Sequence, residues 1–476
     1  MLFFFQFIRN SCCKVLKMKA VLSTKDEKFR DFALNGKMFS VILYVCVPLA
    51  LYQSLTQVFK VFDTMMASHI SSTAVSSVAY ISQIQIMLSA LGSGLAVGAG
   101  IKVSEAYGAG DFELVRRRVS TMTALCACLG AGILVILLPF ASVFLRLMNT
   151  PEEFITLGST YFRVELVALV ITFFNNIYIS IERSRGNSRR ILFLNICIVS
   201  IKLALTALFV YVFHLGITSI AVAPLISQLS VLVFAFINMT KKDSLFSFSV
   251  KAVSFKKEIV SPMLSLSFPV IIEKAAFALG KVIVNSMCTF YGPKTVGALG
   301  ISNNIGGITT MPQAGFQEGG SAVISQNRGA GKYERTIKAF WCELLCNLVI
   351  GVLIMTVTLL GLDFLSEFFA GDDREFALLI KSIYSYEAWG AIPLGINATV
   401  LSLLYGLGKT KITLFMNFCR IFLFRVPVLL YLQKFTDFGS ESAGIVMGVS
   451  NILSGALAVI VGIITIGKIS RRTKSS

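Results

Sequence analysis

Long apolar runs separated by short polar breaks dominate the chain between residues 38 and 466. A helix needs about 20 apolar residues to cross the hydrocarbon core of a membrane. The first half predicts spans over Met38–Met66, Val78–Ile101, Ser120–Leu145, Leu157–Ile181, Ile191–Phe213 and Ile217–Met239. The second half predicts spans over Pro262–Phe290, Val296–Ser321, Ala339–Leu365, Ile380–Leu404, Leu414–Leu432 and Ala443–Ile466. The pattern therefore predicts an all-α integral membrane protein with twelve transmembrane helices.

The polar breaks divide the chain into two lobes with flanking segments. Residues 1–37 form an N-terminal segment, 38–239 the first lobe, 240–261 a polar linker, 262–466 the second lobe and 467–476 a tail. In the N-terminal segment, the apolar run Leu2–Ile8 precedes the basic residues, which is the reverse of a signal peptide. We assign no function to this segment, and whether residues 1–17 belong to the mature chain stays open.

Basic residues fall in alternate breaks, and this alternation predicts the orientation of the chain. One set of loops and the tail contains Arg116, Arg117, Arg118, Arg183, Arg185, Arg189, Arg190, Lys241, Lys242, Lys256, Lys257, Arg328, Lys332, Arg335, Lys409, Lys411, Arg471, Arg472 and Lys474. The other set contains only Arg146, Lys294, Arg374, Lys381 and Lys434. Because cytoplasmic loops carry an excess of Lys and Arg, we expect both termini and the linker in the cytoplasm, as in a plasma membrane protein.

Composition agrees with a membrane protein and argues against several other classes. The chain is 55% hydrophobic and 14% charged, whereas soluble domains carry about 25% charged residues. The net charge of +18 comes from loops between spans, so we expect no nucleic-acid partner. The ten cysteines form no CxxC pair and there are two histidines, so we expect no metal and no cofactor. We expect the lipid bilayer as the surroundings and a monomer as the working unit.

The two halves share an internal repeat. The second span ends in Val103–Glu113 in the first half and the corresponding span ends in Ile324–Glu334 in the second, with a shared Gly-Ala-Gly turn. At the same register Pro48 aligns with Pro269, Lys60 with Lys281, Gly94 with Gly315 and Gly98 with Gly319. After a slip of one residue, Glu165 aligns with Glu387, Asn175 with Asn397 and Asn195 with Asn417. An even number of spans per repeat predicts two pseudo-symmetric six-helix lobes of equal orientation around a central cleft.

Charged residues inside the spans are candidates for function, because each costs about 2.5 to 3.5 kcal/mol at a helix centre. Asp63 is short and cannot reach the membrane surface, so we expect it to face a cleft or a partner. Lys60, three residues earlier, shares its helix face. As residues lining a substrate cleft we select Lys60, Gln57, Glu273, Lys281, Glu318, Asn175 and Asn397. The Gly-x-x-x-Gly pairs at Gly94 and Gly315 are interpreted as helix-packing surfaces.

The ordered set of motifs resembles the multidrug and toxic compound extrusion (MATE) family, and its DinF-like branch in particular. The resemblance covers nearly the whole chain. It depends on Pro48 followed by Phe62-Asp63-Thr64, on the repeated turns Gly108–Gly110 and Gln326–Gly331, and on Arg185-Gly186-Asn187 followed by Leu194-Asn195. The resemblance implies twelve helices in two lobes and export of small amphiphilic organic molecules against an inward flow of protons or sodium ions.

The same resemblance implies a coupling site on the first lobe. Asp63 matches the family's cation-coupling acid, and Asn195 matches an asparagine that accompanies it. Three positions depart from the family pattern. Val199 stands where the DinF-like branch often has an acid, Pro224 replaces a threonine, and Glu273 lies a turn before the acid of NorM-like members.

Alternatives to an ion-coupled antiporter remain open at this point. A flippase for a lipid-linked saccharide shares the two-lobed plan, and the basic pair Lys60 and Lys281 favours it. If both lysines face the cleft, we expect anionic or zwitterionic solutes; otherwise we expect organic cations. A membrane-embedded enzyme is the alternative outside transport, but the spans contain no convincing catalytic constellation.

The orientation predicts which side of the membrane each loop occupies. In single-cysteine variants of intact cells, an impermeant thiol reagent should label Asp372→Cys from outside and leave Ser244→Cys unlabelled until the membrane is opened. Labelling of Ser244→Cys from outside would contradict the arrangement of twelve spans.

Overall fold

The computed structural model describes residues 23–67, 72–147, 152–213, 218–240 and 245–475. The first half contains α3 (Met38–Ala67), α4 (Ser72–Ala109), α5 (Phe112–Leu137), α7 (Glu152–Ser184), α8 (Ser188–Ala207) and α9 (Thr218–Met239). The second half contains α10 (Lys257–Cys288), α11 (Pro293–Gly329), α12 (Tyr333–Leu360), the pair α14 (Arg374–Ala388) and α15 (Ala391–Gly406), the pair α16 (Thr410–Phe418) and α17 (Val426–Phe435), and α18 (Ser442–Ser475). Shorter helices are α2 (Thr24–Asn35), α6 (Ala141–Leu147) and α13 (Leu362–Ala370).

These helices confirm the predicted all-α membrane fold. Within the described residues, nine helices are long and apolar enough to cross a membrane, or ten if the bent pair α14 and α15 is one span. The more polar α10 and α11, with 32 and 37 residues, complete twelve passes. Large hydrophobic side chains such as Val135, Leu147 and Leu360 are exposed on the outside of the bundle. A surface of this kind is stable in lipid, where backbone groups must be satisfied within the helices.

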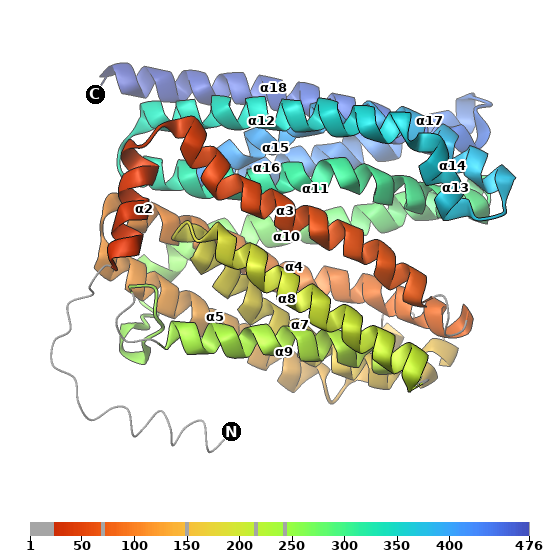
Figure 1. The fold of residues 1–476 in the computed structure, drawn as a ribbon, viewed down its shortest axis with the longest axis horizontal. Coiled ribbons are helices and arrows are strands. Elements are labelled where there is room, and N and C mark those ends of the chain that lie inside the picture. Colours follow the sequence, from red (N-terminus) through yellow and green to blue (C-terminus); the bar gives the residue numbers. More distant parts are fainter. Residues whose placement is uncertain (1–22, 68–71, 148–151, 214–217, 241–244, 476) are drawn as a thin grey trace.

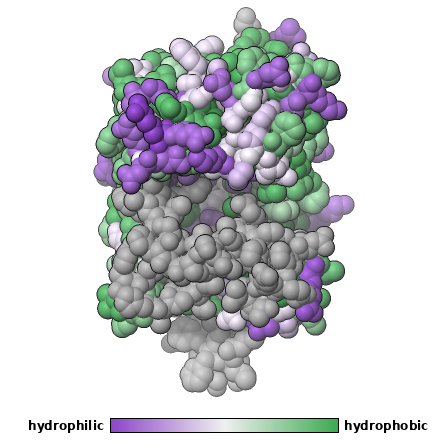
Figure 2. Space-filling model, turned by 90° about the vertical axis from the view of Figure 1, so that its right-hand side faces the viewer, coloured by the Kyte–Doolittle hydropathy of each residue, from purple (hydrophilic) through white to green (hydrophobic). Residues whose placement is uncertain are grey.

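The helices run side by side in two stacked halves (Figure 1). Helix α2, the segment that leads into α10, and the C-terminus lie at one end of the bundle, and α13 lies at the other (Figure 1). We call these the α2 end and the α13 end. Figure 2 shows the α13 end, where hydrophilic side chains gather on the C-terminal lobe and hydrophobic ones lie along its edges. This distribution fits helices whose ends reach water on either side of a membrane.

Many of the expected spans differ in their bounds from the helices in the structure, and three show why. The expected span Ser120–Leu145 begins earlier, at Phe112, because the Asp111 side chain caps the helix by accepting from Leu114 N. The span expected over Ala339–Leu365 begins at Tyr333 and ends at Leu360. The span expected as one helix over Ile380–Leu404 is two helices bent by 49°. Gly390 lies at this break and Pro393 follows in the first turn of α15, where proline is tolerated.

The turns at the α2 end repeat between the two halves. Gly110 and Gly331 follow α4 and α11 with φ of 80° and 73°, a region that favours glycine. After each of them a backbone N–H bonds back to the helix, from Asp111 to Ala106 O and from Lys332 to Asn327 O. Each half therefore reverses direction in the same way at the residues that the sequence repeat aligned.

The two lobes contact each other through glycine surfaces that also repeat. Helix α3 packs on α11, and their counterparts α10 and α4 pack on each other. A Cβ added at Gly94 or Gly98 would overlap the backbone of α10 at Ile271 and Ser267. A Cβ at Gly315 or Gly319 would overlap α3 at Ala50 and Cys46. The interpretation of these glycines as packing surfaces is thus confirmed, and the contacts join the two lobes rather than helices of one lobe.

The three largest clusters of buried apolar side chains lie in the first lobe, in the second lobe and between the two. The core of the first lobe includes Tyr107 and Phe173, and that of the second includes Tyr384. The core between the lobes includes Leu49 of α3 and Phe316 of α11. The lobes therefore share apolar contact along the same helices that carry the glycines.

Adding one methyl group at this contact should weaken the fold. We expect Gly98→Ala to lower the free energy of unfolding by about 1–3 kcal/mol, because the added carbon meets α10 backbone that cannot move alone. The control Gly300→Ala has nothing within 4 Å of the new carbon, so it should be neutral or stabilising by up to about 1 kcal/mol. Unfolding in detergent measures both, and equal stability of the two variants would contradict the contact.

Candidate functional site

An ion pair joins the two lobes in the half of the bundle nearer the α2 end. Arg183 Nη2, on α7 of the first lobe, donates to Glu318 Oε2 on α11 of the second. Gln53 Nε2 on α3 donates to Glu318 Oε1 at 3.1 Å. The side chains of Arg183 and Glu318 are 14% and 28% exposed, so water only partly screens their attraction. Glu318, selected as a cleft residue, is therefore held at the contact between the lobes.

Glu273 lies in a second polar cluster, within the C-terminal lobe. Its side chain on α10 is buried. It accepts hydrogen bonds from Thr413 Oγ1 at 2.6 Å, from Asn417 Nδ2 at 2.7 Å and from Tyr405 Oη. Three donors arranged around one buried carboxyl stabilise its charged form. Such a carboxyl can hold either a proton or a small cation.

The first-lobe candidates are described only in part. The side chains of Lys60 and Asp63 lie outside the described residues, although both positions belong to helix α3. Asn195 on α8 is buried and its Nδ2 donates to Tyr52 O at 3.3 Å and to Thr56 Oγ1 at 3.2 Å. Thr56 precedes Asp63 by two helical turns, or about 10 Å along the axis. Asn195 thus fixes α8 against α3 on the stretch that leads to Asp63.

The other selected residues lie in different places. Gln57 is buried between the lobes and donates to Asn304 O at 3.0 Å, next to Gly307. Asn175 donates to Gln228 within the first lobe. Asn397 is buried in α15. Lys281 is exposed, with its Nζ 5.3 Å from the centre of the Phe277 ring.

The lobes make further close contacts at the α2 end. Ser325 Oγ on α11 donates to Ile101 O on α4 at 2.9 Å, and Gln326 Nε2 donates to Ser184 O at 2.7 Å. A Cβ at Gly108 or at Gly329 would overlap the backbone of the opposite lobe. The described residues therefore close the bundle firmly at this end.

Helix α2 lies across this closed end, and its first half binds the first lobe. Arg185, in the turn after α7, forms a paired contact with Asp26, with its Nε and Nη2 each 3.0 Å from a carboxylate oxygen. Arg30 donates to Tyr107 O at 3.0 Å and to Gly108 O at 2.9 Å. Burial lowers the pKa of Arg185, but the carboxylates of Glu182 and Asp26 outweigh this and raise it above its ordinary value. The guanidinium of Arg185 therefore stays charged at any physiological pH.

The second half of α2 binds the C-terminal lobe. Arg335 Nη2 donates to Ala33 O at 3.2 Å and to Gly36 O at 2.8 Å. Lys332 Nζ donates to Leu34 O at 3.1 Å, and Asn327 Nδ2 to Ala33 O at 3.3 Å. Cations at a helix C-terminus are favourable because the last carbonyls carry partial negative charge. Helix α2 therefore connects both lobes, although no function was assigned to its segment from the sequence.

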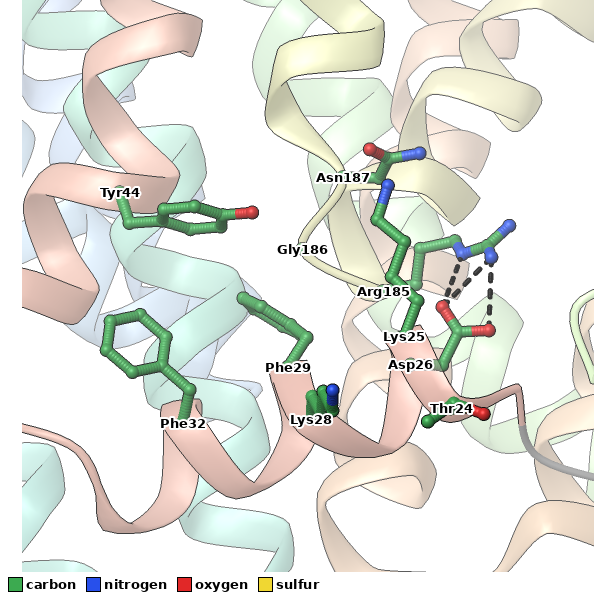
Figure 3. A pocket seen from close by; sticks show the side chains of 10 residues that line it. All are labelled: Thr24, Lys25, Asp26, Lys28, Phe29, Phe32, Tyr44, Arg185, Gly186 and Asn187. Carbon is green, nitrogen blue, oxygen red and sulfur yellow. Dashed lines mark hydrogen bonds and ion pairs between the residues drawn. The ribbon is translucent and has the colours of Figure 1, made fainter.

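A cavity of about 560 Å³ lies beside α2. Figure 3 shows Phe29 and Phe32 of α2 together with Tyr44 of α3 on one side, and the turn Arg185–Asn187 with the Asp26 ion pair on the other. Among the described residues, no group of three or more His, Cys, Asp or Glu side chains could hold a metal ion.

Sequence comparison matches the chain twice to one family. Residues 48–208 and 269–430 each match the MatE family. The chain is 26% identical over 87% of its length to the probable multidrug resistance protein YoeA of Bacillus subtilis, covering 91% of that protein. It is 22% identical over 66% of its length to the multidrug export protein MepA of Staphylococcus aureus, covering 70% of that protein.

Comparison of structures gives the same fold. A solved structure described as the outward-facing conformation of a multidrug resistance MATE family transporter matches with a TM-score of 0.88 and 18% identity. The match covers 95% of this chain and 100% of the other. The two family matches begin at Pro48 and Pro269, the same residues that open the internal repeat.

The α2 contacts predict a specific effect of removing the Asp26 charge. Asp26→Asn should loosen α2, because a hydrogen bond to a charged group contributes about 1.5–3 kcal/mol. We expect backbone hydrogen exchange to rise roughly tenfold or more in α2 and in the turn Gln326–Lys332. The neighbouring exposed Glu27→Gln serves as the control and should leave exchange unchanged. Equal exchange in Asp26→Asn and wild type would show that α2 does not depend on this ion pair.

Proposed function

The chain belongs to the MatE family of multidrug transporters, and we propose that it is a secondary active antiporter that exports small organic molecules in exchange for protons or sodium ions. The observation that carries the proposal is the pair of homologous lobes joined through repeated glycine contacts and closed at one end. Membership of a transporter family also argues against the alternative that the chain is a membrane-embedded enzyme. The DinF-like branch and the antiport itself remain proposals.

Transport would proceed by alternating access between the two lobes. By the distribution of basic residues, the α2 end faces the cytoplasm. The conformation described here is then closed to the cytoplasm by the Arg183–Glu318 pair, by the contacts at Gly108 and Gly329, and by α2. Opening toward the cytoplasm requires breaking the Arg183–Glu318 pair, which joins the lobes directly. A transported ion or solute can shift the equilibrium only by binding the two conformations with different affinity.

Coupling would use acids within the membrane-spanning helices that exchange an ion as access alternates. Asp63 on the first lobe is the principal candidate, with Asn195 holding the adjacent helix, and Glu273 is the candidate on the second lobe. A carboxyl inside a membrane is costly to leave charged, so proton or cation binding is favoured when one side opens. Neither ion is preferred by the contacts described.

The substrate would be a small amphiphilic organic molecule, and the relatives YoeA and MepA are named as a probable multidrug resistance protein and a multidrug export protein. The substrate charge that the protein prefers depends on Lys60 and Lys281. Lys281 stacks on Phe277 and is exposed, so it contributes positive charge only if this surface faces the substrate path. We propose that the protein works as a monomer in the plasma membrane with both termini in the cytoplasm, without nucleic-acid partners or cofactors.

Purified protein in proteoliposomes tests this function. A proton or a sodium gradient, imposed separately, should drive uphill movement of at least one solute from a panel of cationic, neutral and anionic compounds. Asp63→Asn keeps the shape of the side chain but fixes it as neutral, so it should insert normally and lose gradient-driven transport. The exposed Asp437→Asn is the matched control and should transport at the wild-type rate. Uphill transport at an unchanged rate by Asp63→Asn would show that Asp63 is structural.

A further inference from the structure

The C-terminal lobe contains a buried carboxyl that the proposed coupling does not use. Glu343 on α12 is 0% exposed. Its Oε2 accepts a hydrogen bond from Ser402 Oγ on α15 at 2.8 Å. Its other oxygen, Oε1, has no hydrogen-bond partner among the described residues. Gly320 of α11 packs against this carboxyl so closely that a Cβ there would overlap Oε2.

Two more buried acceptor oxygens without donors lie near Glu343. Asn347, one turn further along α12, is 0% exposed and its Oδ1 has no partner in the described part of the chain. Gln313 on α11 is 1% exposed and its Oε1 is likewise unpartnered there. Buried polar atoms are almost always hydrogen-bonded. Three acceptors without donors indicate that a donor is missing from this region.

Polar side chains of α11, α12 and α15 lie in a line that hydrogen bonds join only in part. Gln313 Nε2 donates to Ala391 O at 3.0 Å and to Asn347 O at 3.3 Å. Asn347 Nδ2 donates to Thr399 Oγ1 at 2.9 Å. Ser402, which donates to Glu343, lies three residues after Thr399 and so on the same face of α15. The line runs from the break between α14 and α15 to Glu343.

A small cavity lies at the start of this line. It has a volume of about 20 Å³ and is lined by Ala391, Thr309 and Asn451, among others. This volume suffices for one water molecule, and the lining offers polar partners for it. Ala391 lines the cavity and its carbonyl accepts from Gln313. The buried polar line therefore begins where a water molecule fits.

We propose that Glu343 is a proton-binding site of the C-terminal lobe, and that water entering beside these polar side chains brings and removes its proton. Ser402 is the one side-chain donor to Glu343 in the described structure, and no Lys or Arg forms an ion pair with it there. A bare carboxylate in this position would be buried without a counter-charge, which is strongly unfavourable. On binding, an O–H bond of a hydronium ion breaks, an O–H bond forms on Oε1 and a neutral water remains. The new O–H group supplies the missing donor.

The ligand is a proton rather than a metal cation because of space. Gly320 lies against Oε2, and Ser402 Oγ, which donates to the same oxygen, lies within 2.7 Å of the position that a Cβ at Gly320 would take. A sodium ion would need several oxygen ligands around it, whereas a proton adds almost no volume. The site differs from the Glu273 cluster, where three donors satisfy the carboxyl.

Infrared spectroscopy of the purified protein in lipid nanodiscs tests the site without any transport assay. At neutral pH the difference spectrum between wild type and Glu343→Gln should contain the carbonyl band of a protonated carboxyl, whereas that between wild type and the exposed-site control Glu367→Gln should not. The band should shift in heavy water, because the proton exchanges. Ser402→Ala leaves the carboxyl in place and should move the band to higher frequency, since one hydrogen bond is lost.

Three results would overturn the proposal. A difference spectrum between wild type and Glu343→Gln with no band of a protonated carboxyl would show that the residue is a carboxylate. A band that does not shift in heavy water would show a trapped, purely structural proton. A band that disappears when sodium replaces choline would show a cation site instead.

The role in transport rests on the proposed function, and there Glu343→Gln should lower the number of protons exchanged per solute by one. Absence of transport in the wild type, with the band present, would reject the antiporter and leave the site standing.

Discussion

The close approach of the two lobes through glycine is the constraint on which the rest of the structure depends. Four glycines, Gly94, Gly98, Gly315 and Gly319, let α4 meet α10 and α11 meet α3 at backbone distance. In a membrane, apolar side chains gain little by leaving lipid, so close packing and buried polar contacts must hold helices together. The contacts occur twice, related by the repeat. A structure built this way can open at one end while the central contacts act as a pivot.

Polar groups supplement this packing where the lobes must separate. The Arg183–Glu318 pair and the α2 contacts all lie toward one end of the bundle, and each joins groups from different lobes or spans both. Partly buried ion pairs are strong enough to favour one conformation and weak enough to be broken by ligand binding. The uncharged line at Glu343 lies inside one lobe, so it can persist while the lobes move.

The sequence alone predicted most of the fold but little of the site. Apolar runs and glycines recur at regular spacing along the sequence. The alignment of Gly98 with Gly319 therefore identified both the repeat and its packing surface. Ion pairs between distant segments have no such period, and Arg183 was noted only as a basic loop residue. Helix α2 was missed because its sequence is short and polar, and its stability comes from Asp26 and Arg30 meeting partners far along the chain. Glu343 lay inside a predicted span but was not selected. The rule that a charged residue inside a span is a candidate for function, which selected Asp63, applies to Glu343 as well.

The account's central claim is that the lobes rock about their glycine contact. Pulsed electron spin resonance can measure this in nanodiscs, with spin labels on exposed positions of a variant lacking other reactive cysteines. One pair, Glu113→Cys with Glu334→Cys, reports on the α2 end, and another, Arg146→Cys with Asp372→Cys, reports on the α13 end. When pH, sodium or solute shifts the conformation, the first distance should lengthen as the second shortens. Distances that stay fixed under every condition, or that lengthen together, would contradict alternating access.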